Sequence, residues 1–199
     1  MGTSRVAMPS EHTGSGQWML KLRIIAALMF NRQKAAIRAF DLMLQSSPRD
    51  AYALSGRAHA HAQLGNKAQA IADLRALVAF HPTRSAADWF NLAFLLEGED
   101  DIAAAEPAFR QALALDPKLD RAWYGLGLAL VRQRRFDEAA AALKRNTELQ
   151  PMSPYGWYQL ARVHMDRKQP DEARRILAHL RGFEPKVAAQ LERDIGVAS

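Results

Sequence analysis

Apolar residues in this chain recur at intervals of three and four, and the whole arrangement repeats at a longer interval. Spacing of three and four places side chains on one face of a helix. Trp123 lies 34 residues after Trp89 and 34 residues before Trp157. The same shift relates three further sets: Leu92, Leu126 and Leu160; Ala105, Ala139 and Ala173; Pro117, Pro151 and Pro185. A fixed period of this length predicts a repeat architecture, in which each unit buries its apolar face against the next.

Recurring prolines divide most of the chain into five frames. The frames are 17–50, 51–84, 86–119, 120–153 and 154–187, closing near Pro48, Pro82, Pro117, Pro151 and Pro185. One interval is a residue longer than the others, which indicates an insertion in the loop 83–86. Each frame predicts two amphipathic helices, separated by break signals at 65–66, 98–101, 134–135 and 169–170. No segment has the alternation of a strand, so the predicted fold class is all-α.

The two ends of the chain differ from the frames. Residues 1–16 are small, polar and without periodicity, which predicts a disordered leader. Near the other end, Val187, Ala188, Leu191 and Ile195 share one helical face. This pattern predicts a capping helix that starts near residue 186, with residues 188–199 forming the cap and tail. Pro107 falls inside an expected second helix and predicts a late start or a kink there.

The repeated pattern is Trp-x2-Leu-Gly/Ala-x2-large, then Ala-x3-Phe/Leu, then Pro, and it resembles the tetratricopeptide repeat family over residues 17–187. The last three frames fit best, while Arg23, Arg57 and Asn146 depart from the pattern. The resemblance implies a right-handed superhelical solenoid of five helix-turn-helix repeats with a C-terminal capping helix. It also implies that one face of the first helices lines a concave groove that accepts peptides or helices.

Candidate groove residues lie two before, one after and five after the Trp position of each first helix, a face about 120° from the core side at 100° per residue. Of the fifteen residues at these positions, the twelve candidates are Trp18, Lys21, Tyr52, His59, Phe90, Phe94, Arg121, Tyr124, Leu128, Tyr155, Tyr158 and Arg162. Aromatic residues and Arg are frequent interface anchors, which predicts a partner segment with apolar and acidic side chains. Two alternatives stay open. Phe90, Tyr124 and Tyr158 share one position and would equally suit packing between repeats, and Trp18 would suit a cover for the N-terminal end.

Small residues at a second recurring position indicate close helix packing. Ala58, Ala93, Gly127 and Ala161 allow the two helices of a pair to approach closely. The run 125–130 begins like a dinucleotide-binding loop, but Leu130 replaces its third glycine and no strand precedes it. We interpret this run as helix packing.

No catalytic or metal-binding arrangement emerges from the sequence. His59 and His61 are two residues apart, which on a helix directs them about 200° away from each other. His164 falls on the core face and is expected to be buried and hydrogen-bonded. The acidic stretch 97–101 lacks the spacing of a calcium loop. We therefore expect no metal, no cofactor and no enzymatic activity.

The basic residues do not form a nucleic-acid-binding stripe. Arg132, Arg134 and Arg135 make one cluster, beside Asp137 and Glu138. Binding of nucleic acid usually requires a continuous basic surface with interleaved aromatic residues. The net charge of +6 is therefore a weak indication of a nucleic-acid partner.

Composition limits the class of protein further. The 199 residues are 49% hydrophobic and include no cysteine, which excludes disulfides. The longest apolar run, 24–30, is far shorter than the roughly 20 residues that span a bilayer. We expect a cytoplasmic, non-catalytic scaffold that binds a protein segment in its groove. The alternative is a chaperone, or a substrate-recruiting or regulatory subunit of a separate enzyme or secretion apparatus, which would capture its partner transiently.

Overall fold

The computed structural model describes residues 13–196, which form eleven α-helices and no strand. The all-α prediction is confirmed. The chain divides into an N-terminal unit that ends at His81 and a C-terminal unit that begins at Pro82. Each unit is described by itself.

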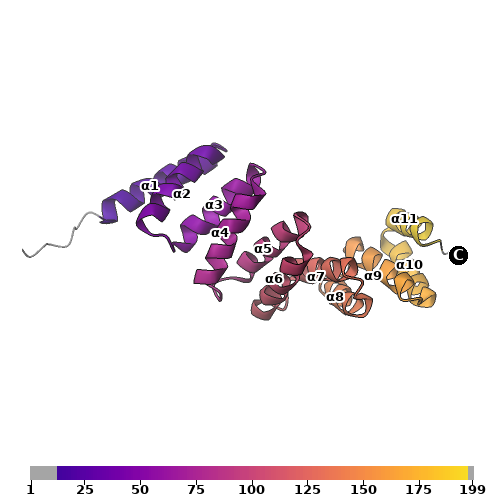
Figure 1. The fold of residues 1–199 in the computed structure, drawn as a ribbon. Helices are drawn as coiled ribbons and strands as arrows, with labels where there is room; N and C mark the ends of the chain where they lie inside the picture. The colour runs from indigo at the N-terminus through magenta and orange to yellow at the C-terminus, as the bar shows by residue number, and fades with distance from the viewer. Residues whose placement is uncertain (1–12, 197–199) are drawn as a thin grey trace, which may run out of the picture. The chain divides into compact units, whose positions relative to one another are not determined.

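The N-terminal unit contains two helix pairs (Figure 1). They are α1 (Thr13–Met29) with α2 (Gln33–Ser46), and α3 (Ala51–Gln63) with α4 (Lys67–Phe80). Ile24, Phe40 and Leu77 are fully buried between them. Because α1 begins at Thr13, the prediction of a disordered leader is wrong for residues 13–16, where the helix extends four residues further than the apolar pattern indicated. Residues 1–12 of that leader lie outside the described part of the chain.

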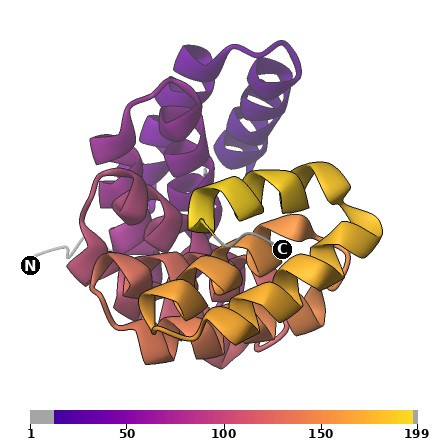
Figure 2. The ribbon, with the colours of Figure 1, turned by 90° about the vertical axis from the view of Figure 1, so that its right-hand side faces the viewer.

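The C-terminal unit contains three helix pairs and one further helix. The pairs are α5 (Ala86–Gly98) with α6 (Ile102–Leu115), α7 (Asp120–Arg132) with α8 (Phe136–Leu149), and α9 (Pro154–Asp166) with α10 (Pro170–Phe183). The last helix, α11 (Pro185–Ile195), lies against α10 and α9 (Figure 2). Its Ala188 and Leu191 are fully buried, so α11 covers apolar surface at the end of this unit. We propose that each helix pair is one repeat and that α11 is the cap.

Local sequence explains where the helices begin. The side chains of Asp50, Ser85 and Asp101 accept hydrogen bonds from backbone N–H groups in the first turns of α3, α5 and α6. These bonds satisfy donors that have no partner within the helix. Proline opens α9, α10 and α11, where its missing N–H removes no helical hydrogen bond.

Every turn within a pair contains one residue in the left-handed region. These residues are Asn31, Gly65, Asp100, Arg134 and Lys168, with φ between 52° and 75°. Their regular spacing shows that the turn geometry repeats, although glycine, which adopts this region without steric cost, fills only one of the five positions.

Close approach between helices depends on glycine at defined positions. A Cβ on Gly127 would lie 2.7 Å from Leu143 Cγ in the second helix of the same pair. A Cβ on Gly125 would lie 2.4 Å from Phe109 Cζ, in the preceding α6, and one on Gly56 would lie 2.1 Å from the ring of Phe40. The run 125–130 is therefore helix packing, as the sequence indicated.

The helix α6 corrects one expectation. It begins at Ile102, five residues before Pro107, so of the two expected outcomes the late start is wrong and the kink stays a prediction. Pro107 is exposed, and so is Ala103, whose carbonyl lacks a helical N–H partner because of the proline. Solvent can satisfy that carbonyl, which explains why the helix continues through the proline.

The repeated tryptophans attach α5, α7 and α9 to the loop before each of these helices. The indole N–H groups of Trp89, Trp123 and Trp157 donate to the backbone carbonyls of Pro82, Pro117 and Pro151 at 2.8–2.9 Å. All three rings are half-buried. The Trp and Pro positions of the sequence pattern thus form one structural unit.

Arg57 stands where the repeat pattern has leucine, and the structure shows what the guanidinium does there. It donates two hydrogen bonds to the buried carboxylate of Asp73 in α4 and one to Asp41 in α2. The side chain therefore joins three helices of the N-terminal unit. Paired, hydrogen-bonded geometry of this kind offsets the cost of burying a charge.

Candidate functional site

The C-terminal unit contains a cavity of about 520 Å³, and aromatic side chains make up much of its wall. First helices supply one side: Phe90 and Phe94 from α5, Arg121, Tyr124 and Leu128 from α7, and Tyr155 from α9. The other lining residues are Glu97, Phe109, Asp120, Gly125, Asn146, Gln150 and Ser153. Six of the twelve candidate groove residues thus line one cavity.

Ring contacts fix the wall of this cavity. The ring centroid of Phe90 lies 6.1 Å from that of Phe94, in a stacked arrangement, and 6.1 Å from that of the buried Phe109. The Arg121 guanidinium carbon lies 4.9 Å from the Phe90 centroid. This cation–π contact holds the positive charge of Arg121 at the cavity edge.

Phe90, Tyr124 and Tyr158 contact the next first helix or the cap. Phe90 contacts Arg121 of α7, and Tyr124 hydrogen-bonds with Gln159 of α9. The Tyr158 hydroxyl donates to Asp194 of α11. All three side chains are half-buried. Their shared position therefore makes contacts between neighbouring elements, while Phe90 and Tyr124 also face the cavity.

The two tyrosine hydroxyls have different surroundings. Burial raises the pKa of Tyr124 above its ordinary value, and the hydrogen bond with Gln159 opposes this shift. The hydrogen bond to Asp194 raises the pKa of Tyr158, with burial adding to it. Both groups are therefore neutral hydrogen-bonding phenols at neutral pH.

The other candidate residues of this unit differ in whether they line the cavity as well as being exposed to solvent. Phe94 and Tyr155 are 57% and 71% exposed although both line the cavity, so they are open to a partner. Arg162 is exposed on α9 and does not line the cavity.

The remaining candidates belong to the N-terminal unit. Trp18 and Lys21 are exposed on α1. Tyr52 makes an edge-to-face contact with Phe40, at 5.8 Å between centroids. His59 hydrogen-bonds to Gln63 on its own helix. None of the four lines the cavity of the C-terminal unit.

Several lining residues carry weak or no sequence signal. Asn146 departs from the repeat pattern, and the structure gives the reason. Its amide Nδ2 donates to the Asp120 carbonyl at 2.9 Å, and its Oδ1 occupies the space that a Cβ on Gly156 would need. Gln150 and Ser153 belong to the connection between α8 and α9 and have no periodic signature.

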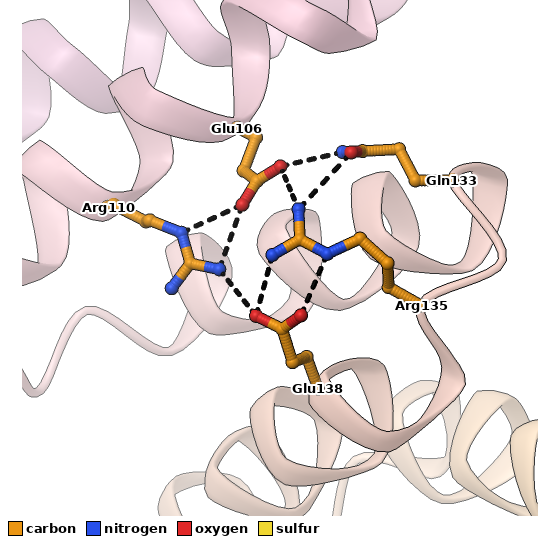
Figure 3. Close-up of polar contacts among 5 residues, drawn as sticks. All are labelled: Glu106, Arg110, Gln133, Arg135 and Glu138. Atoms are coloured by element: carbon orange, nitrogen blue, oxygen red, sulfur yellow. Dashed lines mark hydrogen bonds and ion pairs between the residues drawn. The ribbon is translucent and has the colours of Figure 1, made fainter.

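Two of the three arginines of the basic cluster, Arg132 and Arg135, form ion pairs within the chain, and Figure 3 shows those of Arg135. Arg135 bonds to Glu106 of α6 and to Glu138 of α8, and Arg110 bonds to the same two carboxylates. Burial alone would raise the pKa of Glu106, but hydrogen bonds from Gln133 and Arg110 and the charge of Arg135 lower it overall. This network joins the second helices of neighbouring pairs, and the guanidinium of Arg135 has little capacity left for phosphate.

Arg132 also forms ion pairs, with Glu97 at 3.9 Å and with Asp100 in the turn between α5 and α6. Arg167 pairs similarly with Asp137 at 2.8 Å. Ion pairs between successive turns therefore recur along the C-terminal unit. Arg132 and Arg135 therefore lie close together in the sequence because both form ion pairs with neighbouring helices and turns.

The histidines have local partners. His164 is half-buried and its Nδ1 lies 2.9 Å from Gln169 Oε1, whereas His61 Nδ1 lies 3.5 Å from Asn66. Among the described residues, no group of three or more His, Cys, Asp or Glu side chains is placed to hold a metal ion. Within residues 13–196, no helix combines the length and apolarity needed to cross a membrane.

Repeated antiparallel helix pairs, glycine-dependent contacts and an aromatic cavity define an α-helical repeat protein. Comparison with known proteins identifies the repeat. The tetratricopeptide repeat profile matches residues 22–91, 90–154 and 129–185. The chain belongs to the tetratricopeptide repeat family. A search of curated protein sequences gives no match.

Solved structures share the fold. A crystal structure of MamA protein superposes with a TM-score of 0.79 at 21% identity, covering 94% of this chain and 99% of that one. MamA 41-end from Desulfovibrio magneticus RS-1 gives a TM-score of 0.76 at 19% identity, covering 91% and 97%. YrrB, described as a TPR protein with an unusual peptide-binding site, gives 0.78 at 16% identity, covering 85% and 88%. These neighbours share the fold, and the tetratricopeptide repeats support a protein-interaction scaffold.

Proposed function

We propose that the C-terminal unit binds a segment of a partner protein without catalysing a reaction, with an apolar side chain of that segment inserted into the aromatic cavity. The observation that carries this proposal is the joint placement of Phe90, Phe94, Tyr124 and Tyr155 around one cavity of about 520 Å³. Phe94 and Tyr155 remain largely exposed. Exposed aromatic side chains beside a preformed cavity are typical anchors of interfaces.

The charged residues at the cavity restrict which side chains a partner can place in it. Glu97 and Asp120 are carboxylates in the lining, so an acidic side chain inside the cavity would be repelled. Arg121 at the edge and the exposed Arg162 on α9 offer positive charge outside it. We propose a partner segment with a large apolar anchor and flanking acidic residues. Recognition of a peptide segment also accords with the peptide-binding site named for YrrB.

The direct test is selection of peptides from a random library on the immobilised chain, followed by calorimetry. We expect enriched peptides to contain an aromatic or leucine anchor with nearby Asp or Glu. The double variant Phe94→Ala/Tyr155→Ala should weaken their binding by tenfold or more, on the order of 1.4 kcal/mol or above. Arg162→Gln should weaken acidic peptides but not neutral analogues.

The matched control is Phe30→Ala, an exposed phenylalanine of the N-terminal unit, which should leave peptide binding unchanged. Thermal unfolding of each variant checks that the fold is intact. Binding that survives Phe94→Ala/Tyr155→Ala unchanged would remove the cavity as the site. Enrichment of peptides without an apolar anchor would contradict the proposed partner.

A further inference from the structure

One helix of the N-terminal unit presents a large apolar surface that no described element of that unit covers. In α1, Ile24 and Ala27 are buried. Five large apolar residues of the same helix are each about half or more exposed: Trp18, Met19, Leu22, Ile25 and Met29. We call these five residues the outer face of α1. Apolar residues on both sides of a helix are typical of a helix that is covered on both sides.

Basic residues border the outer face on both sides. At 100° per residue, its members lie between about 100° and 220° from the buried Ile24. Lys21 lies at about 60° and Arg23 at about 260°. Both side chains are exposed. The apolar strip thus has one basic residue on each side, and the long side chains of Lys21 and Arg23 can extend along its edges.

The repeat architecture explains why this face is available. In α3, Gly56 lies against Phe40 of the preceding helix α2, and Ala53 and Ala60, three residues before and four after it on the same helical face, are fully buried. The positions 34 residues earlier are Met19, Leu22 and Ala26, all exposed. Met19 and Leu22 thus stand at first-helix positions where α3 has the small residues Ala53 and Gly56.

Charge indicates what the outer face meets. Residues 13–40 contain five basic residues, Lys21, Arg23, Arg32, Lys34 and Arg38, and no acidic residue. All five side chains are exposed. Pairing with the same face of a second copy would bring Lys21 and Arg23 close to their own equivalents, which repel. The complementary surface is therefore apolar and anionic.

We propose that the outer face of α1 binds the surface of an anionic lipid bilayer, with the helix lying in the plane of the interface. Trp18, Leu22 and Met29 enter the boundary between headgroups and acyl chains, and Lys21 and Arg23 contact lipid phosphates. A helix with Trp and Leu on one face and basic residues beside them is suited to this position. The attraction of anionic headgroups for each basic residue adds to the apolar contribution. This activity is independent of peptide binding in the C-terminal unit.

Vesicle co-sedimentation of the full chain tests the proposal. We expect binding to vesicles of phosphatidylcholine mixed with phosphatidylglycerol, and much weaker binding to phosphatidylcholine alone. Leu22→Gln/Met29→Gln should reduce partition by about tenfold or more. Lys21→Gln/Arg23→Gln should reduce it by roughly 10- to 30-fold, and added salt should reduce wild-type binding.

Matched controls make the same chemical changes elsewhere. Leu42→Gln/Met152→Gln replaces an exposed leucine and an exposed methionine outside α1. Arg174→Gln/Arg175→Gln removes two exposed positive charges from α10. Both control variants should bind vesicles like the wild type. Should Leu22→Gln/Met29→Gln fail to fold by circular dichroism, the charge variants carry the test alone.

Three results would overturn the proposal. The first is no binding of the wild type to anionic vesicles, and the second is equal loss of binding in the matched controls. The third is a wild-type dimer in sedimentation that Leu22→Gln/Met29→Gln dissociates while vesicles are not bound, which would assign the outer face to a second copy. None of these results bears on peptide binding by the C-terminal unit.

Discussion

At the scale of single residues, the turn inside each helix pair is the point where sequence and geometry agree least. Arg134 and Lys168 have φ of 59° and 58°, where a side chain brings Cβ close to backbone atoms. Asn31 and Asp100 tolerate this region better because their short polar side chains can bond locally. Arg134 and Lys168 therefore hold backbone strain that glycine would not.

We predict that Arg134→Gly and Lys168→Gly each stabilise the chain by about 0.5–1 kcal/mol, because the relief of left-handed backbone strain exceeds the stabilisation of the unfolded chain by the added freedom of glycine. Urea unfolding measures the change. Gly65→Ala, at the equivalent position with φ of 75°, is the reverse control and should destabilise by about 1 kcal/mol or more. Destabilisation by both glycine variants would show that the arginine and lysine side chains contribute more than the strain costs.

At the scale of elements, a large side chain on a second helix is matched by a missing side chain on the next first helix. Phe40 in α2 faces Gly56 in α3, and Phe109 in α6 faces Gly125 in α7. One period after Phe109 and Gly125 the residues are Leu143 and Gln159. The phenylalanine–glycine match therefore occurs at two of the junctions between successive pairs and is absent from the sequence one period after the second.

We predict that Gly125→Ala destabilises by about 1–3 kcal/mol, since its Cβ would lie 2.4 Å from Phe109 Cζ in a tightly packed contact. Phe109→Leu should destabilise the chain by itself but relieve the clash with the added Cβ. The double variant should therefore lose about 1 kcal/mol less stability than the sum of the losses in the two single variants. A double-mutant cycle in urea measures the coupling. Gly182→Ala, where nothing lies within 4 Å of the added Cβ, should instead stabilise by about 0.5–1 kcal/mol. Strictly additive changes at 109 and 125 would contradict this packing account.

At the scale of the whole molecule, the end of the C-terminal unit is covered by a further helix, whereas the start of the N-terminal unit has no such cover among the described residues. The helix α11 buries Ala188 and Leu191 against α9 and α10, while Gln190 and Arg193 are exposed. No equivalent helix covers the outer face of α1 within the described residues. Repeat arrays require such polar-faced caps because each repeat buries surface only against its neighbours.

We predict that truncation after Glu184 destabilises the C-terminal unit by on the order of 3 kcal/mol or more, because the surface under Ala188 and Leu191 becomes exposed. Urea unfolding measures the loss, and Lys186→Gln, an exposed change in the same helix, should stay within about 0.5 kcal/mol. Truncation also removes Asp194, which raises the pKa of Tyr158. Tyr158 should therefore ionise at lower pH in a spectroscopic titration. Unchanged stability would show that α11 is not a cap.

The family and the all-α fold were accessible from the sequence alone, because both depend on local periodicity. Apolar spacing, break signals and prolines recur every 34 or 35 residues and act within a few residues of their own positions. The insertion at 83–86 and the packing role of Gly127 follow from the same register. Even here, the predicted disorder of residues 13–16 and the predicted late start of α6 were wrong, since helix ends depend on small local energies.

The candidate site was predictable only in part. Helical spacing predicted the face that holds Phe90, Phe94, Tyr124 and Tyr155, because the angular position of a side chain on a helix follows from residue number. It missed Asn146 and Gln150, which reach the cavity from α8 and the loop after it.

Only the tertiary structure decided how groups that are distant along the chain meet. Arg135 and Glu106 are 29 residues apart, and Tyr158 and Asp194 are 36 apart, yet each pair is in contact. Such contacts depend on the rotation and separation of neighbouring helices, which no local pattern contains. The period specified which helices form and which faces they bury. Packing between the helices determined which arginines are paired, which aromatic side chains share a cavity, and which apolar face is left open.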